Sequence, residues 1–343
     1  MDATFIEHIQ ATLTAKRQSL VTWLRSTPSK KKIVRLGSAN EQAVQAHVHV
    51  LDTALEKIAA QTLGRCIVCH EYVGTALLEM DYTACVCINH LSAPEIRELE
   101  TELELSQVVQ RALLPQQMPE IPGLELAASS RSAHIIGGDY YDFFRFRNGA
   151  YGLAIGDVAG HGVSASLLMA SMQAALHTLI PMCDSPANVL RQVNRLFRHN
   201  IHFTTFVTLF LGAFDPATRT LIYCSAGHNP PLLFHQQARG REPVTWLRPT
   251  GAAIGLIEEF QMTTKTVTLW PGDILLLYTD GVTEALNLQG EEIGQERLVT
   301  LIRQASRLSA EDLVRALRRM LQEFSNDQPL VDDTTIVVCK IAG

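Results

Sequence analysis

The sequence AIGDVAGHGVSASLLMA at residues 154–170 decides the expected fold. An apolar run ends at Asp157, glycines stand at positions 156, 160 and 162, and a run of helix-forming residues follows. Glycines between a strand and a helix often cradle a phosphate with their backbone N–H groups, but such loops carry a lysine. This turn carries a carboxylate instead, so a phosphate-binding loop does not explain it.

Three other aspartates occupy similar places, where a strand-like run meets a turn. Asp139 ends the motif GGD, Asp280 follows the apolar run LLLYT, and Asp332 precedes the run TTIVVCK. A single aspartate of this kind is usually a turn former that hydrogen-bonds its own backbone. Clustered carboxylates raise one another's pKa unless a cation is near, and carboxylate oxygens are the ligands that Mg²⁺ and Mn²⁺ prefer. Two such ions about 3.5–4 Å apart can activate a water and hold a phosphoryl group.

Short strands and two clear helices follow one another from about residue 116 to the end. One helix-forming run begins near residue 163, and another begins at Ser185-Pro186, an N-cap serine followed by proline at the first helical position. We expect strands at 124–130, 139–146, 151–156, 204–214, 218–224, 231–235, 264–269, 273–279 and 335–341. This content predicts an α+β sandwich with sheets inside and helices outside.

Six motifs carry a specific resemblance: GGDYYDFF, IGDVAGHGVSASLLMA, TTFVTLFLGAFD, YCSAGHNPPLLF, YTDGVTEALN and DDTTIVV. They occur in the order found in bacterial metal-dependent protein phosphatases of the PPM type, which are protein phosphatase 2C-like. Residues 116–343 resemble the branch of sigma-factor-regulating serine phosphatases of stress response and sporulation. The resemblance implies an αββα four-layer sandwich with two Mn²⁺ or Mg²⁺ ions between its sheets.

The same resemblance implies a role for each acid. Asp157 bridges both metals, and the carbonyl of Val158 is a further ligand. Asp139 holds one ion, whereas Asp280 and Asp332 complete the other. A water that bridges the metals attacks phosphoserine or phosphothreonine in line, without a covalent intermediate. All four family acids are present, so the sequence predicts a working enzyme.

Polar residues near these acids are expected to have supporting roles. His161 and Asp142 lie close enough in sequence to assist proton transfer, but a structural role is preferred for each. His228 belongs to a turn that shapes the site. Asp333 orients Asp332 and is not itself expected to bind metal.

The expected substrate is a phosphorylated signalling protein, which in this branch is typically an anti-sigma-factor antagonist. Two other interpretations remain open. One is a catalytically silent platform that captures a partner protein. The other is a nucleotide cyclase, because GGDYYDFF resembles the GGDEF signature, although this leaves the other five motifs unexplained. Metal-dependent phosphate release separates the enzyme from the platform.

Residues 1–62 are expected to form an antiparallel helical hairpin. Apolar residues recur at helical spacing over 4–26 and 41–62, and the segment between them contains proline, glycine and a basic cluster. The basic residues of that turn are Lys30, Lys31, Lys32 and Arg35.

Residues 63–92 contain four of the seven cysteines, within a chain whose odd cysteine count argues for thiols and a metal site. Two zinc ligand sets are open, both containing Cys66 and Cys69. The preferred set adds Cys87 and His90, since a two-residue gap suits both halves of a tetrahedral site, and the alternative uses Cys85 in place of His90. This spacing and the hairpin resemble a DksA/TraR-type zinc finger, which implies one structural Zn²⁺.

The zinc module is expected to act as a sensor or docking domain. DksA-like proteins carry acidic residues at the hairpin tip that enters RNA polymerase, whereas the corresponding turn here is basic. RNA polymerase binding is therefore not the preferred function, and copurification with the polymerase would reverse that preference.

A linker helix is expected over residues 93–115. Ser92 and Glu95 have the spacing of a capping box, and Pro115 closes the helix. One face carries residues spaced three and four apart, which makes a homodimer through helix 93–114 plausible. The phosphatase domain then occupies residues 116–343.

Charge and hydropathy argue against several classes of protein. The formal net charge of -6 gives no support to a nucleic-acid-binding surface. No uninterrupted apolar run approaches the roughly 18 residues of a membrane span. The start, MDATFIEHIQ, lacks the basic and apolar regions of a signal peptide, so we expect a cytoplasmic protein.

Overall fold

The structure is a computed structural model, and it divides the chain into two compact units, Met1–Thr101 and Glu102–Gly343. Each unit is described by itself. The structure describes residues 3–26, 41–74, 78, 83–87, 90, 92–160, 162–200, 206–237, 242–256, 261–328 and 330–342.

The first unit contains two packed helices, α1 (Ala3–Ser26) and α3 (Glu41–Ala59). Their shared core includes Leu13 and Leu51, both almost fully buried, and an ion pair joins Arg17 to Asp52. These helices occupy the ranges expected for the hairpin. The segment 27–40, with its four basic residues, lies outside the described residues, so the hairpin turn and its charge remain predictions.

Helix α5 (Ala93–Leu113) begins as the capping box predicts. The N–H and hydroxyl of Ser92 both donate to the Glu95 carboxylate, at 2.8 and 2.6 Å. The boundary between the two compact units falls inside this helix, after Thr101, and its C-terminal half belongs to the second unit. The finer four-part division of the chain remains a prediction.

The second unit contains two five-stranded antiparallel sheets. One sheet has the order β1 (Leu124–Arg131), β10 (Thr334–Ile341), β9 (Ile274–Tyr278), β6 (Leu232–Phe234) and β7 (Val244–Trp246). The other has the order β2 (Tyr140–Arg145), β3 (Tyr151–Val158), β4 (Val207–Asp215), β5 (Thr220–Ala226) and β8 (Lys265–Thr268). Two sheets with every named pairing antiparallel confirm the predicted α+β class.

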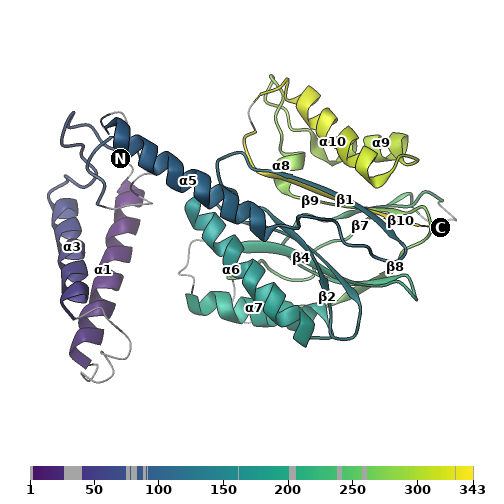
Figure 1. The fold of residues 1–343 in the computed structure, drawn as a ribbon, viewed down its shortest axis with the longest axis horizontal. Helices are drawn as coiled ribbons and strands as arrows, with labels where there is room; N and C mark the ends of the chain where they lie inside the picture. The colour runs from purple at the N-terminus through teal and green to yellow at the C-terminus, as the bar shows by residue number, and fades with distance from the viewer. Residues whose placement is uncertain are drawn as a thin grey trace. The chain divides into compact units, whose positions relative to one another are not determined.

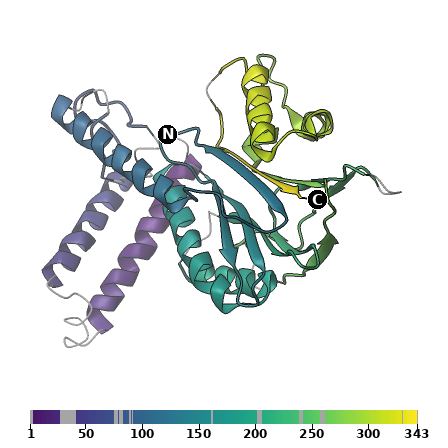
Figure 2. The ribbon, with the colours of Figure 1, turned by 45° about the vertical axis from the view of Figure 1, so that its right-hand side comes forward.

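Helices cover the outer face of each sheet (Figures 1 and 2). The helices of this unit are α6 (Val163–Leu179), the short η2 (Ile180–Met182), α7 (Pro186–Asn200), α8 (Asp280–Thr283), α9 (Gly294–Ala305) and α10 (Ala310–Phe324). One core joins α6 and α7 to the sheet of β3, another joins α9 and α10 to the sheet of β9, and a third fills the space between the sheets. Four layers follow, in the order helices, sheet, sheet, helices.

Strand alternation decides where Asp157 points. In β3, Leu153 and Ile155 belong to the core between the sheets, whereas Ala154 and Val158 belong to the core under α6. Successive side chains of a strand alternate between faces, so Asp157 lies on the face of Leu153 and Ile155. The carboxylate therefore faces the opposite sheet.

The expected element list lacked the short helices α8 and η2, and it also lacked three larger or sheet-forming elements. Strand β7 was missed because three residues give almost no alternation signal. Helices α9 and α10 were also missed, and the expectation of only two long helices was wrong. Their signal was present in the sequence, since Leu313, Leu317 and Leu321 recur every four residues along α10 and are buried.

Among the described helices, α6 with its following turn, over Ala165–Met182, is long and apolar enough by composition to cross a bilayer. Its Met169, Met172 and Leu176 are fully buried in the core under the sheet of β3. The helix is thus one layer of the sandwich, and composition alone is weak evidence for a membrane span.

Candidate metal centre

The four predicted acids come from both sheets and meet between them. Asp139 immediately precedes β2 and Asp157 lies near the end of β3, in one sheet. Asp280 follows β9 as the first residue of α8, and Asp332 lies just before β10, in the other sheet. The charges of Asp280 and Asp332 both act on Asp157, whose own charge acts on Asp139. The structure thus brings together all four acids.

The electrostatics of this centre favour a bound cation. Burial, then the charges of Asp280 and Asp332, raise the pKa of Asp157 to about 7. Burial and the charge of Asp157 hold the pKa of Asp139 well above its ordinary value, and burial and Asp332 raise the pKa of Asp280. Divalent cations prefer oxygen ligands and would remove this repulsion. The donor set therefore fits the Mn²⁺ or Mg²⁺ ions that the sequence predicts.

A threonine holds Asp139 in place from the other sheet. The Thr279 hydroxyl donates to the Asp139 carboxylate at 2.8 Å and accepts the backbone N–H of Thr335 at 2.9 Å. Thr279 and Thr335 are fully buried, at the ends of β9 and β10. The bridge fixes the start of β2 against the opposite sheet.

Asp333 fastens the loop that carries Asp139. Its carboxylate accepts the backbone N–H groups of Ala133, at 2.8 Å, and Gly138, at 2.6 Å. A Cβ atom at Gly137 would lie 2.1 Å from this carboxylate, so the loop packs this closely only without a side chain there. The N–H of Asp333 donates to Asp332 at 2.8 Å, which agrees with the expected orienting role.

Gly138 lets the backbone approach Asp157. A Cβ atom at this position would lie 2.8 Å from the Val158 carbonyl oxygen and 3.2 Å from a carboxylate oxygen of Asp157. Those are the two groups expected to bind metal from the end of β3. A small residue at position 138 therefore leaves the room that an ion and its ligands need.

Left-handed glycines shape the turn after Asp157. Gly160 has φ +103° and Gly162 has φ +77°, a region that disfavours side chains. These values explain the glycines that the sequence places before α6. His161 lies outside the described residues, so its expected role remains a prediction.

Gln110 of α5 is a buried neighbour of this loop that sequence reasoning missed. Its side-chain amide donates to the Gly137 carbonyl at 2.5 Å and accepts the Gly137 N–H at 3.1 Å. Gln107, one turn earlier, donates to the Ile135 carbonyl at 2.9 Å. The available signal was a polar residue at the core-facing spacing of the helix, in a half of the stripe that also contains Ser106. The loop before Asp139 is thus held by α5 on one side and by Asp333 on the other.

Asp142 does not join the acidic centre. It lies on the face of β2 that is directed toward α6, where its carboxylate accepts the Tyr140 hydroxyl at 2.8 Å and contacts the ring nitrogen of His177 at 2.8 Å. The structural role that the sequence favoured agrees with this position.

His228 is buried beside the strand that carries Asp157. Its ring nitrogen lies 2.9 Å from the Thr208 hydroxyl, and Thr208 pairs with Asp157 across β3 and β4. Burial lowers the pKa of His228 to about 4, so the ring is neutral near pH 7. A neutral, tethered ring supports the strand end and gives no proton at neutral pH.

A second group of ligand-type side chains lies in the first unit. Ligand atoms of Cys66, Cys69, Cys87 and His90 all lie within 4.8 Å of one another. The sulfur of Cys66 is 3.6 Å from the His90 ring, and the sulfurs of Cys69 and Cys87 are 3.8 Å apart. Four sulfur and nitrogen atoms at such separations fit a tetrahedral Zn²⁺. Cys85 is outside this group, so the geometry favours the preferred ligand set.

The surroundings of Cys66 favour a thiolate. Burial raises its pKa, but backbone N–H groups, including those of Cys87 and Val68 at 3.3 and 3.4 Å, together with His90, bring it down to about 5. Thiolates are the form in which cysteines bind metal. Burial and the two neighbouring thiols instead raise the pKa of Cys87 to about 11, so its proton would leave only as a metal binds.

Comparisons with known proteins find similar phosphatases and a similar fold. The chain is similar to phosphoserine phosphatase RsbU of Bacillus subtilis (strain 168), with 29% identity over 244 residues, 71% of each chain. It is 28% identical over 187 residues to phosphoserine phosphatase RsbP of the same organism, covering 53% of this chain and 45% of that one. The SiaA-PP2C domain of Pseudomonas aeruginosa has a similar fold, with TM-score 0.64 and 24% identity, over 73% of this chain and 100% of that domain.

Residues 147–342, more than half of the chain, match the family described as Stage II sporulation protein E (SpoIIE). That segment includes three of the four acids, Asp157, Asp280 and Asp332. The chain belongs to the SpoIIE family of PP2C-type phosphatases.

Proposed function

We propose that the second unit is a metal-dependent protein serine/threonine phosphatase that hydrolyses a phosphoserine or phosphothreonine of a signalling protein. The observation that carries the proposal is the meeting of Asp139, Asp157, Asp280 and Asp332 between the sheets, around an Asp157 whose pKa is raised to about 7. The named activities of the relatives RsbU and RsbP support the same reaction.

The chain's own residues supply the metal ligands and their alignment. Asp157 would hold both ions, with the Val158 carbonyl as a further ligand; Asp139 would hold one ion, and Asp280 with Asp332 the other. When bound, two such ions activate a water and stabilise charge on the phosphoryl oxygens. The hydrogen bonds from Thr279 and to Asp333 keep the ligands in position before any ion arrives.

The preferred natural substrate is a phosphorylated anti-sigma-factor antagonist in the cytoplasm. Similarity to RsbU and RsbP supports this choice, as does the match of residues 147–342 to the family described by a sporulation protein. Incubation with phosphorylated candidates, with loss of phosphate followed by mass spectrometry, tests the choice directly.

Phosphate release from a phosphoserine protein or peptide, with Mn²⁺ against EDTA, tests the reaction. We expect turnover that requires the metal and falls at least about 1,000-fold in Asp157→Asn, because the bridging ligand is lost. Asp215→Asn is the matched control, since Asp215 caps a surface turn through Ala217 and Thr218. Metal-independent turnover, or full activity in Asp157→Asn, would reject the proposal.

The first unit is proposed to hold one structural Zn²⁺ through Cys66, Cys69, Cys87 and His90 and to regulate the phosphatase. The clustered ligand atoms support the zinc site. Coupling through α5 is supported by Gln110, which contacts the loop before Asp139. Removal of residues 1–92 should change turnover with a phosphopeptide, and unchanged activity would rule out the coupling.

A homodimer through helix 93–114 is also proposed. Leu105, Val108 and Val109 of α5 are each more than half exposed, which is an unusual density of apolar surface on one helix. Analytical ultracentrifugation of the wild type against Leu105→Glu tests it. A monomeric wild-type protein at micromolar concentration would contradict the proposal.

A further inference from the structure

A cleft of about 500 Å³ adjoins the acidic centre. Its wall includes Gly281 of α8 and Asp332, which lies just before β10. Other parts of the wall come from α10 and from the last residue of β1. A segment of polypeptide attached to a phosphoserine at the centre would therefore have this cleft as a path.

Two arginines lie in the cleft wall. Arg131 ends β1, and Arg318 lies in the second half of α10. Burial, and then the positive charge of Arg131, lower the pKa of Arg318. The two guanidinium groups are thus close enough to repel each other.

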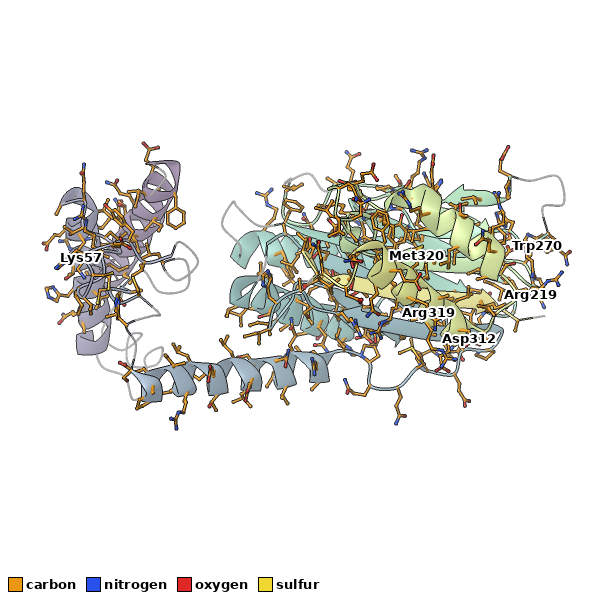
Figure 3. The ribbon with its side chains drawn as sticks, turned by 90° about the horizontal axis from the view of Figure 1, so that it is seen from above. Lys57, Arg219, Trp270, Asp312, Arg319 and Met320 are labelled. Carbon is orange, nitrogen blue, oxygen red and sulfur yellow. The ribbon has the colours of Figure 1, made fainter. Side chains whose placement is uncertain are left out.

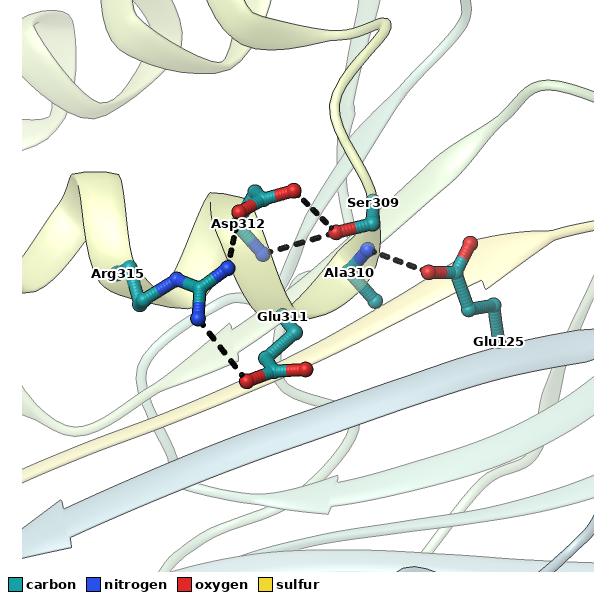
Figure 4. A network of polar contacts seen from close by, with 6 residues as sticks. All are labelled: Glu125, Ser309, Ala310, Glu311, Asp312 and Arg315. Atoms are coloured by element: carbon teal, nitrogen blue, oxygen red, sulfur yellow. Dashed lines mark hydrogen bonds and ion pairs between the residues drawn. The ribbon is translucent and has the colours of Figure 1, made fainter.

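The side chain of neither arginine has an ion pair or hydrogen bond with another described residue of the chain. Arg315, one turn away on the same helix, is different: it contacts Glu311 at 3.2 Å and also Asp312 (Figure 4). Asp312 is itself fixed by the N-cap hydroxyl of Ser309 at 2.7 Å. Carboxylates thus satisfy Arg315, whereas the positive charge of Arg131 and Arg318 stays available in the cleft.

Two neighbouring cations without a counter-ion favour an anion, and the planar guanidinium group matches a carboxylate with two parallel hydrogen bonds. The cleft also carries acids: Glu284 and Glu292 belong to the segment around α8, and Asp332 belongs to the acidic centre. Glu284 is affected by the charge of Asp280, so that wall belongs to the metal side of the cleft. A further acid, Asp327, follows α10, and its carboxylate accepts the Gln322 side-chain amide at 2.7 Å. The cleft therefore has an acidic wall next to the candidate metal centre, whereas the wall formed by β1, α10 and the turn after α10 carries the two arginines, with Asp327 as the one acid among its described residues.

Apolar side chains complete the cleft. Leu286, Leu321 and Val331 line it, and the Val331 side chain is 72% exposed. Such a surface can contact the main body of a peptide while the arginines bind a charged group on it. The occupant that fits both features is an extended peptide with an acidic side chain.

We propose that Arg131 and Arg318 form a specificity subsite that binds a carboxylate on a residue flanking the phosphoserine of the substrate protein. The proposal rests on the phosphatase function proposed above. It assigns no chemistry to the arginines: they select the substrate, and the acidic centre carries out the reaction.

Two phosphoserine peptides that differ only in flanking glutamates or glutamines test the subsite on the full chain with Mn²⁺. In Arg131→Gln and Arg318→Gln, kcat/KM for the glutamate peptide should fall about 10-fold through KM, as expected for loss of a charge-assisted hydrogen bond. The glutamine peptide and p-nitrophenyl phosphate should change by less than about twofold. A subsite for the substrate therefore predicts an effect that depends on peptide charge.

Arg319→Gln is the matched control. Arg319 is the next residue of α10, is exposed outside the cleft wall, and lies on the helix face of Asp312 (Figure 3). It should leave all three substrates unchanged. Thermal melting of each variant checks that the fold is intact.

Equal losses with both peptides, or a matching loss with p-nitrophenyl phosphate, would overturn the subsite, since the arginines would then act at the reacting phosphoryl group or the metals. If no substrate turns over with Mn²⁺, the phosphatase proposal fails separately. Fluorescence anisotropy of the labelled glutamate peptide then decides the subsite: weaker binding in the two variants but not in Arg319→Gln supports it, and equal binding rejects it.

Discussion

The acidic centre and the Cys/His cluster are built in opposite ways. The centre takes its four carboxylates from separate segments of the chain, held by two sheets and three apolar cores. The Cys/His cluster takes its ligands from residues 66–90, around a core of Cys66, Val73 and Leu78 with a few half-buried neighbours. The first site exists because the sandwich folds, whereas the second region has too little core to fold strongly without a bound ion.

Zinc removal gives the largest expected effect, because structural zinc supplies most of the folding free energy of such a small region. We expect about one zinc per chain in the wild type, retained in Cys85→Ser and reduced below about 0.1 in Cys69→Ser. Inductively coupled plasma mass spectrometry measures the content, and hydrogen exchange should show loss of protection near residues 63–90 only. Zinc kept by Cys69→Ser, or lost from Cys85→Ser, would refute the ligand set.

Gly138→Ala tests whether the acidic centre depends on close backbone approach. The added methyl would meet the Val158 carbonyl at 2.8 Å, so the loop carrying Asp139 must move away from Asp157. A displacement near 1 Å costs roughly 100-fold in turnover. The measurement is kcat with saturating Mn²⁺. Gly74→Ala, where a Cβ atom meets nothing within 4 Å, serves as the control, and equal activity of the two variants would contradict this account.

Gln110→Ala tests whether α5 positions the loop before Asp139. Loss of both hydrogen bonds to Gly137 should weaken Mn²⁺ activation about 10-fold, because outer hydrogen bonds of this kind orient metal ligands. The readout is the Mn²⁺ concentration for half-maximal turnover, which should rise in Gln110→Ala. In Gln110→Glu this concentration should return part of the way to the wild-type value, since the glutamate carboxylate can still accept the Gly137 N–H. Gln116→Ala, with contacts only to Arg111 and Leu114, is the control. An unchanged metal requirement would make Gln110 purely structural.

The pH dependence of stability gives the smallest effect. The pKa of Asp157 is about 7 in the folded, metal-free protein against an ordinary 3.8, so the folded state binds a proton that the unfolded state releases. Its contribution to stability is complete below pH 4 and is lost as the pH rises toward 7.

With EDTA, the melting temperature of the wild type relative to Asp157→Asn should therefore fall from pH 4.5 to pH 7.5, by several degrees. With saturating Mn²⁺ the trend should reverse, because the metal binds the deprotonated carboxylates. Differential scanning fluorimetry measures both. A difference that stays flat in EDTA would show that the acids do not repel one another as the structure implies.

Much of the acidic centre could be predicted from local pattern. Asp139, Asp157, Asp280 and Asp332 each stand where a strand-like run meets a turn, and the glycines at 160 and 162 indicate the sharp turn after Asp157. The supporting residues could not be predicted in the same way. Asp333 fastens Gly138, and Gln110 fastens Gly137, through contacts between segments that have no pattern in common.

The sequence by itself determined the places of nine of the ten named strands along the chain and the helix start at Ser92, because alternation and capping act over a few residues. It also narrowed the zinc ligands to two sets, since spacing limits which side chains can reach one ion. Only the tertiary structure placed Asp157 toward the opposite sheet, separated Cys85 from the other cysteines and brought Arg131 beside Arg318. These facts depend on how segments far apart in the chain pack together. That packing buries whole faces of sheets and helices, and no single stretch of sequence contains such a face.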